Sequence, residues 1–244
     1  MVEQQKEKEI VLLFKKLWGM ITLNREYLDR LEYDKLVASY DEKYPVRPLY
    51  YSGNVVNLRN YKNMPLTIQV CDYIHVTQSM RDWIVEKELV FDKPVTIENV
   101  CVHIWKIYSE FTKHTKYRTD ADLYGVNEQW IPNMSQFYIT EKNKWIGDCE
   151  NFALLCAGLI EASGVPRGLY RCTAGMTKLG GHCSLTAYDP IEKQWVQYET
   201  TATKPKVIFW GDDIYINTVW FSFDSTMSFS NKKTNDVEVR GNGQ

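Results

Sequence analysis

The strongest hydrophobic pattern in the chain predicts a helix from Cys149 to about Ala162. Its apolar positions recur every three or four residues and define one buried face: Phe152, Cys156, Leu159 and Ile160. Asp148 is a favourable N-cap, and Gly164 ends the helix. The pattern therefore places a cysteine at the N-terminal end of an amphipathic helix.

A second pattern predicts a β-hairpin. Residues 182–188 alternate between two faces, with Cys183, Leu185 and Ala187 on the apolar one. Residues 195–200 are rich in aromatic and β-branched side chains, and a turn sequence separates the two runs. The two runs therefore predict an antiparallel pair of strands.

The register of this hairpin selects a carboxylate partner for His182. With Asp189 opposite Glu192 across the turn, the residue opposite His182 is Glu199, and directly opposed residues share a face. Asp189 lies an odd number of positions from His182, so its side chain points to the other face. The pattern favours Glu199, whereas a loop longer by one residue would reverse the face.

The remaining patterns divide the chain into three parts. Residues 1–48 predict an N-terminal helical region, residues 49–230 one domain, and residues 231–244 a polar, disordered tail. Within the domain we expect strand-like sequence over 49–76, helices over 78–89 and 97–112, and further strands over 207–210 and 214–223.

Cys149 is the candidate nucleophile of the chain. Unpaired amides and the helix dipole at a helix N-terminus favour the thiolate that attacks carbonyl carbon. Of four histidines, His182 is the best placed base because it opens a predicted strand beside a carboxylate. The other three have no predicted partner and are interpreted as structural: His75, His103 and His114.

Several motifs occur in an order and spacing typical of one superfamily. They are Tyr117-Arg118-Thr119-Asp120, Trp130-Ile131-Pro132, Gly147-Asp148-Cys149-Glu150-Asn151-Phe152-Ala153, Gly164-Val165-Pro166-Arg167, Gly181-His182 and Trp195-Val196-Gln197-Tyr198-Glu199-Thr200-Thr201. Over residues 95–203 they resemble the transglutaminase-like superfamily, especially its bacterial and phage-encoded cysteine-proteinase-like members. The resemblance implies an α+β fold with a papain-like core, in which a nucleophile helix packs on an antiparallel sheet.

The resemblance also implies a Cys, His, acid triad for amide hydrolysis, deglycosylation or acyl transfer. Glu199 stands where the superfamily most often has aspartate, and Asn151 stands where aspartate is common. Cys183 and Ser184 replace small and aromatic residues after the histidine. These departures bear on the substrate class more than on catalysis.

The triad gives each residue a task. Cys149 would attack an amide or ester carbonyl, His182 would carry the thiol proton to the leaving amine, and Glu199 would orient the imidazolium. The Cys149 backbone amide is the first expected oxyanion donor. The resemblance suggests the Trp130 indole as the second, and three residues compete with it: Gln129, Asn143 and Trp145.

Two functions follow from these motifs. The first is a cysteine-dependent hydrolase or acyltransferase acting on amide bonds of a peptide or protein substrate. The alternative is a non-enzymatic phage virion structural or interaction protein built on a transglutaminase-like fold. In that case the N-terminal helices would dock to other virion proteins, whereas in the simpler interpretation they cover the catalytic domain.

Composition and motif spacing argue against a nucleic-acid-binding or a metal-binding protein. A net charge of -2 offers no general attraction to nucleic acid. No Cys-x-x-Cys pair occurs, and the acidic pairs Asp120 with Asp122 and Asp212 with Asp213 lack a calcium-binding loop, so no metal and no cofactor are expected.

The start of the chain bears on its location. The apolar run from Ile10 to Phe14 follows a polar start and is too short for a signal peptide or a membrane span. We expect a cytoplasmic protein, or a virion protein if phage-encoded, whose six cysteines are reduced thiols.

Overall fold

The computed structural model describes most of the predicted domain. The described residues are 50–51, 55–59, 65–91, 97–126, 128–165, 167–189, 194–208, 212–226 and 228–230. The predicted N-terminal helical region (1–48) and the polar tail (231–244) lie outside the described residues.

Helices and strands follow one another in a mixed order. The helices are α3 (Gln78–Glu86), α4 (Ile97–Lys113), α5 (Asp120–Tyr124), α6 (Asn133–Gln136) and α7 (Cys149–Ala162), with a 3-10 turn, η1 (Val70–Tyr73). The strands are β1 (Tyr50–Tyr51), β2 (Val55–Arg59), β3 (Pro65–Gln69), β4 (Thr115–Tyr117), β5 (Thr140–Glu141), β6 (Lys144–Gly147), β7 (Tyr170–Thr177), β8 (Gly180–Asp189), β9 (Gln194–Tyr198), β10 (Val207–Ile208), β11 (Thr218–Phe223) and β12 (Ser228–Ser230).

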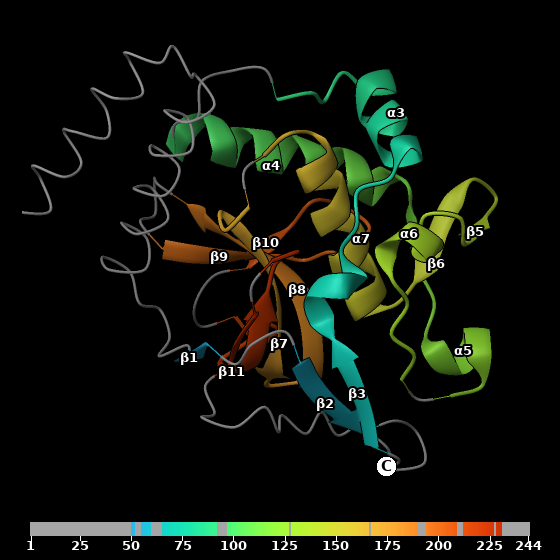
Figure 1. Cartoon of the computed structure of the whole chain (residues 1–244), viewed down its shortest axis with the longest axis vertical. Coiled ribbons are helices and arrows are strands. Elements are labelled where there is room, and N and C mark those ends of the chain that lie inside the picture. Colours follow the sequence, from blue (N-terminus) through green and yellow to red (C-terminus); the bar gives the residue numbers. More distant parts are fainter. Residues whose placement is uncertain are drawn as a thin grey trace, which may run out of the picture.

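The central sheet has seven strands in the order β1-β12-β11-β7-β8-β9-β10, and each recorded pairing in it is antiparallel. Helix α7 packs on β7 and β8, and α4 also contacts β8 (Figure 1). A nucleophile helix on an antiparallel sheet is the α+β, papain-like arrangement that the sequence predicts. The predicted fold class is therefore confirmed.

Helix α7 is buried on nearly every side, and this differs from the single buried face that its sequence pattern predicted. Every residue from Phe152 to Ile160 is buried, including Leu154 and Ala157 outside the predicted stripe. The reason is that α3, α4 and α6 cover the sides of α7 that do not face the sheet. Such a central helix holds its N-terminal residue in a fixed place relative to the sheet.

Strand β7 was not predicted, although it lies in the middle of the sheet between β11 and β8. Seven of its eight residues are buried, so its two faces do not alternate between apolar and polar side chains. Thr173 and Thr186 share a hydrogen bond of 2.8 Å across β7 and β8. A strand covered on both faces therefore gives no period-two signal.

The β8–β9 hairpin is antiparallel as predicted, but its predicted register was wrong by two residues. Asp189 pairs with Gln194 and not with Glu192. Four residues, 190–193, therefore connect the two strands, whereas the predicted register left two. A shift of two residues leaves every side chain on its predicted face, and for this reason the expected neighbourhood of His182 survives the error.

A small second sheet supports the start of α7. Its order is β4-β6-β5, with β4 parallel to β6, and Tyr117 pairs with Gly147. The Trp145 ring of β6 lies 5.6 Å from the Phe111 ring of α4 in a stacked arrangement. These strands were not predicted because segments of two to four residues are too short to show a period-two pattern.

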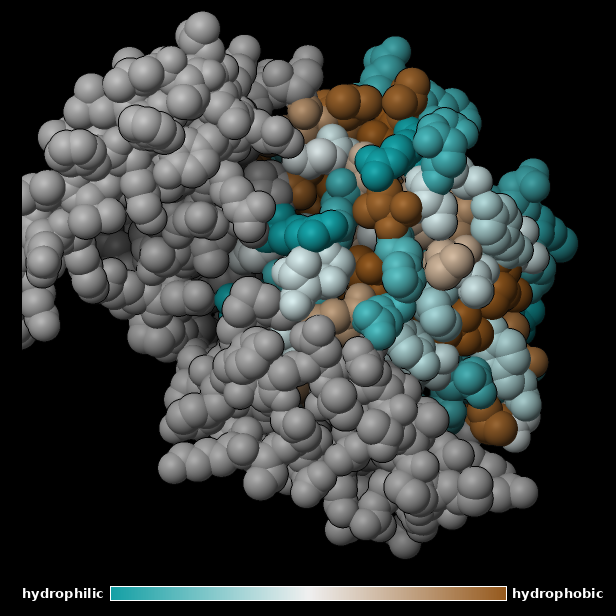
Figure 2. All heavy atoms as spheres, in the orientation of Figure 1, coloured by the Kyte–Doolittle hydropathy of each residue, from teal (hydrophilic) through white to brown (hydrophobic). Residues whose placement is uncertain are grey.

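The surface shows separate patches of hydrophobic residues among hydrophilic ones on the face drawn in Figure 2. Large exposed hydrophobic residues are spread over several elements, among them Val85 of α3, Trp105 of α4 and Leu179 of the β7–β8 turn. None of the described helices has the length and apolar character needed to cross a bilayer.

Candidate active site

Cys149 is the first residue of α7, as the sequence predicted. Asp148 is the N-cap and forms a capping box with Asn151, whose side-chain oxygen accepts a hydrogen bond from the Asp148 amide at 3.4 Å. A Cβ at Gly147 would lie 2.8 Å from the Asn151 Cβ atom. The close approach of β6 to the first turn of α7 therefore requires glycine before the Asp-Cys pair.

The environment of the Cys149 thiol is acidic. Its Sγ donates to Glu150 Oε2 at 3.4 Å. Burial, together with the charges of Glu150 and Asp148, raises the pKa of the Cys149 thiol well above its usual value. Burial is the largest of these causes, so the surroundings of Cys149 oppose the thiolate that its position at the helix N-terminus was predicted to favour.

His182 and Glu199 meet directly. His182 Nε2 lies 2.9 Å from Glu199 Oε2, and the two side chains are 16% and 6% exposed. His182 lies on β8, and Glu199 directly follows the last residue of β9. The structure thus brings together the imidazole and the carboxylate that hairpin register selected.

Glu199 is held by several further contacts. Its Oε1 accepts hydrogen bonds from the Thr201 amide at 3.1 Å and from the Thr201 hydroxyl at 2.5 Å, and Gln197 Nε2 lies 3.4 Å from Oε2. Burial alone would raise the pKa of the Glu199 carboxyl. The hydrogen bonds and charge of His182, with the Thr201 donors, outweigh burial and lower that pKa.

The backbone at Glu199 is also anchored to the helical layer. The Tyr108 hydroxyl of α4 lies 2.9 Å from the Glu199 carbonyl oxygen and accepts a hydrogen bond of 2.7 Å from the Lys206 amide. Gln197 in turn fixes the neighbouring chain, since its side chain bonds the Ile214 carbonyl and the Ile216 amide at 3.0 Å each. The carboxylate therefore has a rigid support.

Cys149 and His182 do not share a hydrogen bond in the described part of the chain. The thiol donates to Glu150, while the recorded partner of His182 is Glu199. Because Glu199 holds Nε2, Nδ1 is the imidazole nitrogen left for another partner. The structure thus brings two of the three predicted residues into contact and places the third at the N-terminus of the helix packed on β7 and β8.

Trp130 has another partner in this structure. Its indole Nε1 donates to Glu128 Oε1 at 2.7 Å, and its ring packs beside Phe221 and Phe223. The competing Trp145 indole donates to the Phe137 carbonyl oxygen at 3.0 Å. Neither indole N–H is directed at Cys149 by these bonds, so the first-turn backbone amide remains the expected oxyanion donor.

A cluster of carboxylates beside the nucleophile was missed by the sequence analysis. One ligand oxygen from each of Asp120, Asp148 and Glu150 lies within 4.8 Å of the others, and all three residues are buried. The cluster forms because Asp120 begins α5 while Asp148 and Glu150 flank the start of α7. The sequence had instead paired Asp120 with Asp122, which is exposed.

The carboxylates of this cluster resist ionisation. Burial and the Asp148 charge raise the pKa of Asp120 to about 8, and the same two causes raise the pKa of Glu128, which is outside the cluster, to about 7. Three oxygens have no hydrogen-bond partner among the described residues: Asp120 Oδ1, Asp148 Oδ1 and Glu150 Oε1. Buried carboxylate oxygens without donors are ligands of the kind that hard divalent cations prefer.

The other three histidines lie away from this pair. The backbone of His75 is clamped by Asn133, His103 packs beside Phe91, and His114 bonds Glu110 at 3.0 Å. None of the six cysteines forms a disulfide, and four of them are buried: Cys71, Cys156, Cys172 and Cys183. Cys149 and Cys101 are the partly exposed ones.

Comparisons with known proteins found similar chains among solved structures. No protein-family profile and no curated protein matches the sequence. Among solved structures, the chain is similar to LapG of Legionella pneumophila, with a TM-score of 0.47 and 18% identity over 65% of this chain and 90% of that chain.

Two further LapG structures give similar values. EGTA-treated LapG has a TM-score of 0.47 at 18% identity over 65% of this chain and 87% of that chain, and calcium-bound LapG has 0.45 at 22% over 64% and 76%. This likeness is one of fold.

Proposed function

We propose that this protein is a thiol-dependent hydrolase that cleaves amide bonds of a peptide or protein substrate through Cys149, His182 and Glu199. The observation that carries the proposal is the hydrogen bond of 2.9 Å between His182 of β8 and Glu199, which directly follows β9, at the sheet on which the cysteine helix packs. A partly buried imidazole held by an ionised carboxylate is the partner that a nucleophilic cysteine requires.

The reaction starts with transfer of the thiol proton. His182 Nδ1 accepts that proton, since Nε2 is engaged by Glu199, and Cys149 Sγ forms a bond to the carbonyl carbon. Collapse of the tetrahedral intermediate breaks the carbon–nitrogen bond, and the proton passes from His182 to the leaving amine. Water then cleaves the thioester; an amine acceptor in place of water would give acyl transfer.

A non-enzymatic role on the same fold is the second candidate, and one observation favours it. The Cys149 thiol bonds Glu150, and its pKa is raised by burial and by neighbouring carboxylates. A protein that used the fold only as a structural or interaction part, for instance in a phage particle, would retain such a thiol without reactivity. The two functions therefore predict opposite behaviour of Cys149 towards an electrophile.

Alkylation with iodoacetamide at neutral pH, followed by peptide mapping, separates the two functions. Cys101 provides an internal comparison because it is also partly exposed and lies on a helix. The hydrolase proposal expects Cys149 to react at least about tenfold faster than Cys101 and to lose that advantage in His182→Ala. Equal rates at both cysteines in the wild type would contradict it.

A screen of a peptide library then identifies the substrate. Wild type and Cys149→Ala are compared, and products formed only by the wild type define the cleaved bond. Removal of a triad nucleophile typically costs about 10⁴- to 10⁶-fold in rate. Transfer to an added amine, detected by mass spectrometry, distinguishes acyl transfer from hydrolysis.

We also propose that Asp120, Asp148 and Glu150 hold a divalent cation such as Ca²⁺. Support comes from their shared position and from their buried oxygens without donors, which fit the oxygen ligands that Ca²⁺ takes. A bound cation would supply positive charge that offsets three carboxylates at the start of α7. Asp148 and Glu150 flank the nucleophile, so the cation would also fix the first turn of its helix.

A further inference from the structure

A separate cavity lies near the opposite end of α7 from Cys149. Its volume is about 560 Å³, which is in the range of small-molecule sites. Glu161, one of its lining residues, follows Cys149 by twelve positions on α7, or about 18 Å at 1.5 Å per residue. The cavity is therefore distinct from the candidate active site.

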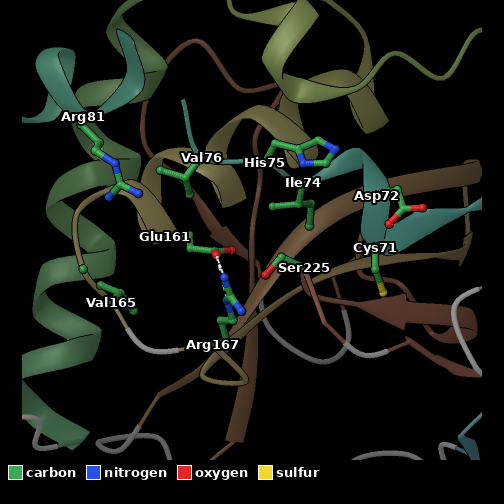
Figure 3. Close-up of a pocket in the computed structure, with 11 residues that line it drawn as sticks. Cys71, Asp72, Ile74, His75, Val76, Arg81, Glu161, Val165, Arg167 and Ser225 are labelled. Carbon is green, nitrogen blue, oxygen red and sulfur yellow. Dashed lines mark hydrogen bonds and ion pairs between the residues drawn. The ribbon is translucent and has the colours of Figure 1, made fainter. Parts of the chain in front are cut away.

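A preorganised guanidinium lines this cavity (Figure 3). Arg167 Nε donates to Glu161 Oε1 at 2.7 Å, and its Nη2 lies 2.6 Å from the same oxygen. The Tyr170 hydroxyl donates to Glu161 Oε2 at 3.0 Å and holds the carboxylate from its other side. Glu161 thus neutralises Arg167 and fixes it, and within the described ranges the Nη1 donors of the guanidinium have no partner.

Arg81 of α3 adds a second positive charge to the lining. No described carboxylate pairs with it, and the neighbouring Asp82 accepts a hydrogen bond from Gln78 at 2.8 Å. The remaining acidic residue of the lining, Asp72, lies across the cavity from Arg81 in Figure 3. Uncompensated positive charge is therefore concentrated on the Arg81 side.

A buried hydroxyl faces the same space. Ser225 Oγ is buried and has no hydrogen-bond partner among the described residues. The turn that carries it is fixed, because Asp224 Oδ1 accepts bonds of 2.7 Å from both the amide and the hydroxyl of Thr226. A buried hydroxyl without a hydrogen bond destabilises the fold, so a ligand atom that bonds Ser225 Oγ would be stabilising.

The apolar part of the lining is also preformed. Ile74, Val76 and Val165 contribute to it. The segment that carries the first two is held by Asn133, whose side chain accepts from the His75 amide at 2.8 Å and donates to the His75 carbonyl at 2.9 Å. A binding site with a fixed backbone needs little ordering when its ligand arrives.

We propose that this cavity binds a small molecule with one oxyanion group, a carboxylate or a phosphate, placed between Arg81 and Arg167. The ligand's hydroxyl or amide group bonds Ser225 Oγ, and its carbon skeleton packs on Ile74, Val76 and Val165. Glu161, Asp72 and the charge of Asp224, which also acts on Arg167, limit the site to a ligand of low negative charge, because Arg81 is the one arginine of the described lining without a carboxylate partner among the described residues.

Isothermal titration calorimetry on the full chain tests this with two probes, 3-hydroxybutyrate for a carboxylate and glycerol 3-phosphate for a phosphate. We expect saturable binding of one ligand per chain for at least one probe. A titration with sodium chloride at the same ionic strength as the probe should give no such binding. Arg81→Gln is expected to weaken binding at least about tenfold, as loss of a charge-assisted hydrogen bond does.

Three further variants make the result specific. Ser225→Ala is expected to weaken binding about threefold to tenfold. Arg118→Gln, which removes a guanidinium outside the cavity, leaves binding unchanged. Cys149→Ala also binds normally, so the outcome is independent of the proposed hydrolase. Absence of saturable binding for both probes, or wild-type affinity in Arg81→Gln, would overturn the proposal.

Discussion

His182 Nε2 lies 2.9 Å from Glu199 Oε2, although the two residues are not opposite each other in the β8–β9 ladder. The last recorded pair of that ladder is Leu185 with Tyr198, so the register extended by one residue sets Glu199 opposite Ser184. The longer side chain of glutamate spans the diagonal to His182 on the same face. Glutamate in place of the shorter aspartate is thus explained by the hairpin geometry.

This relationship predicts different effects for two substitutions of Glu199. Glu199→Gln keeps the length but removes the charge, and we expect the rate of peptide cleavage to fall about 10³- to 10⁴-fold, as for the amide replacement of a triad acid. Glu199→Asp keeps the charge but shortens the reach to His182, and a misplacement of about 1 Å costs about a hundredfold.

The measurement is kcat/KM on the peptide found in the library screen. Thr201→Ser serves as the matched control, because it keeps the hydroxyl that donates to Glu199 Oε1 at 2.5 Å. Its activity should stay within about threefold of wild type. Wild-type activity in Glu199→Asp would remove the geometric explanation.

The lowered pKa of Glu199 predicts a pH-dependent contribution to stability. The folded protein holds this carboxyl below its ordinary value of 4.5, so below that pH the unfolded chain binds the proton first. Glu199 therefore stabilises the fold above about pH 4.5, and the stabilisation is lost as pH falls through the folded pKa.

Urea unfolding of wild type and Glu199→Gln over a pH series measures this contribution. We expect the difference in the free energy of unfolding to be about 1–3 kcal/mol at neutral pH and to shrink as the pH falls below the ordinary carboxyl value. Glu86→Gln, at an exposed position of α3, is the matched control and should differ little from wild type throughout. If the difference in the free energy of unfolding between wild type and Glu199→Gln did not change with pH, the lowered pKa of Glu199 would be contradicted.

The helix, the hairpin and the pairing of His182 with Glu199 could be predicted because each depends on local periodicity. Cys149 begins α7 where a capping sequence meets an apolar helical pattern. The hairpin register was wrong by two residues, yet the face was right because side chains alternate with a period of two. Strand β7 was missed because both of its faces are buried and its pattern does not alternate.

The carboxylate cluster could not be predicted because it depends on contacts between distant segments. Asp120 meets Asp148 and Glu150 only when two helix N-termini come together. Burial contributes most to the raised pKa of the Cys149 thiol and the charges of Glu150 and Asp148 add to it, and neither effect can be read from the pattern of one helix. The cavity at Arg81 and Arg167 likewise combines residues from several segments.

The carboxylate cluster predicts stabilisation by calcium. Thermal unfolding in EGTA and in increasing Ca²⁺ should show a melting temperature that rises with Ca²⁺, because a cation that binds only the folded state at a hundred times its Kd contributes about 2.7 kcal/mol. In Asp120→Asn the Ca²⁺ concentration needed for the same rise in melting temperature is expected to be at least about tenfold higher, since the substitution removes one charged ligand from the cluster.

Asp122→Asn is the matched control for that experiment. Asp122 lies on the same short helix but is exposed and lies outside the cluster, so its variant should respond to Ca²⁺ like wild type. Terbium luminescence, sensitised by a nearby tryptophan such as Trp130, gives a second measurement without enzyme activity. Equal Ca²⁺ responses in Asp120→Asn and wild type would exclude the cluster as the site.

Gly158 of α7 packs directly against Asn133, the residue that holds the His75 backbone beside the Arg81 cavity. A Cβ at this position would lie 1.8 Å from Asn133 Nδ2, the atom that donates to the His75 carbonyl at 2.9 Å. We expect Gly158→Ala to lower the free energy of unfolding by about 1–3 kcal/mol, because a closely packed core cannot accept the added methyl group. Equilibrium unfolding in urea measures the loss.

A double-mutant cycle separates this clash from a change in helix propensity. Asn133→Ala alone should destabilise the fold by about 1–3 kcal/mol, since the His75 backbone loses both side-chain hydrogen bonds. With Asn133 shortened, the methyl group that Gly158→Ala adds would have room, so the combined variant should be less destabilised than the two single losses added together. Strict additivity would show that the loss in Gly158→Ala has another cause than contact with Asn133.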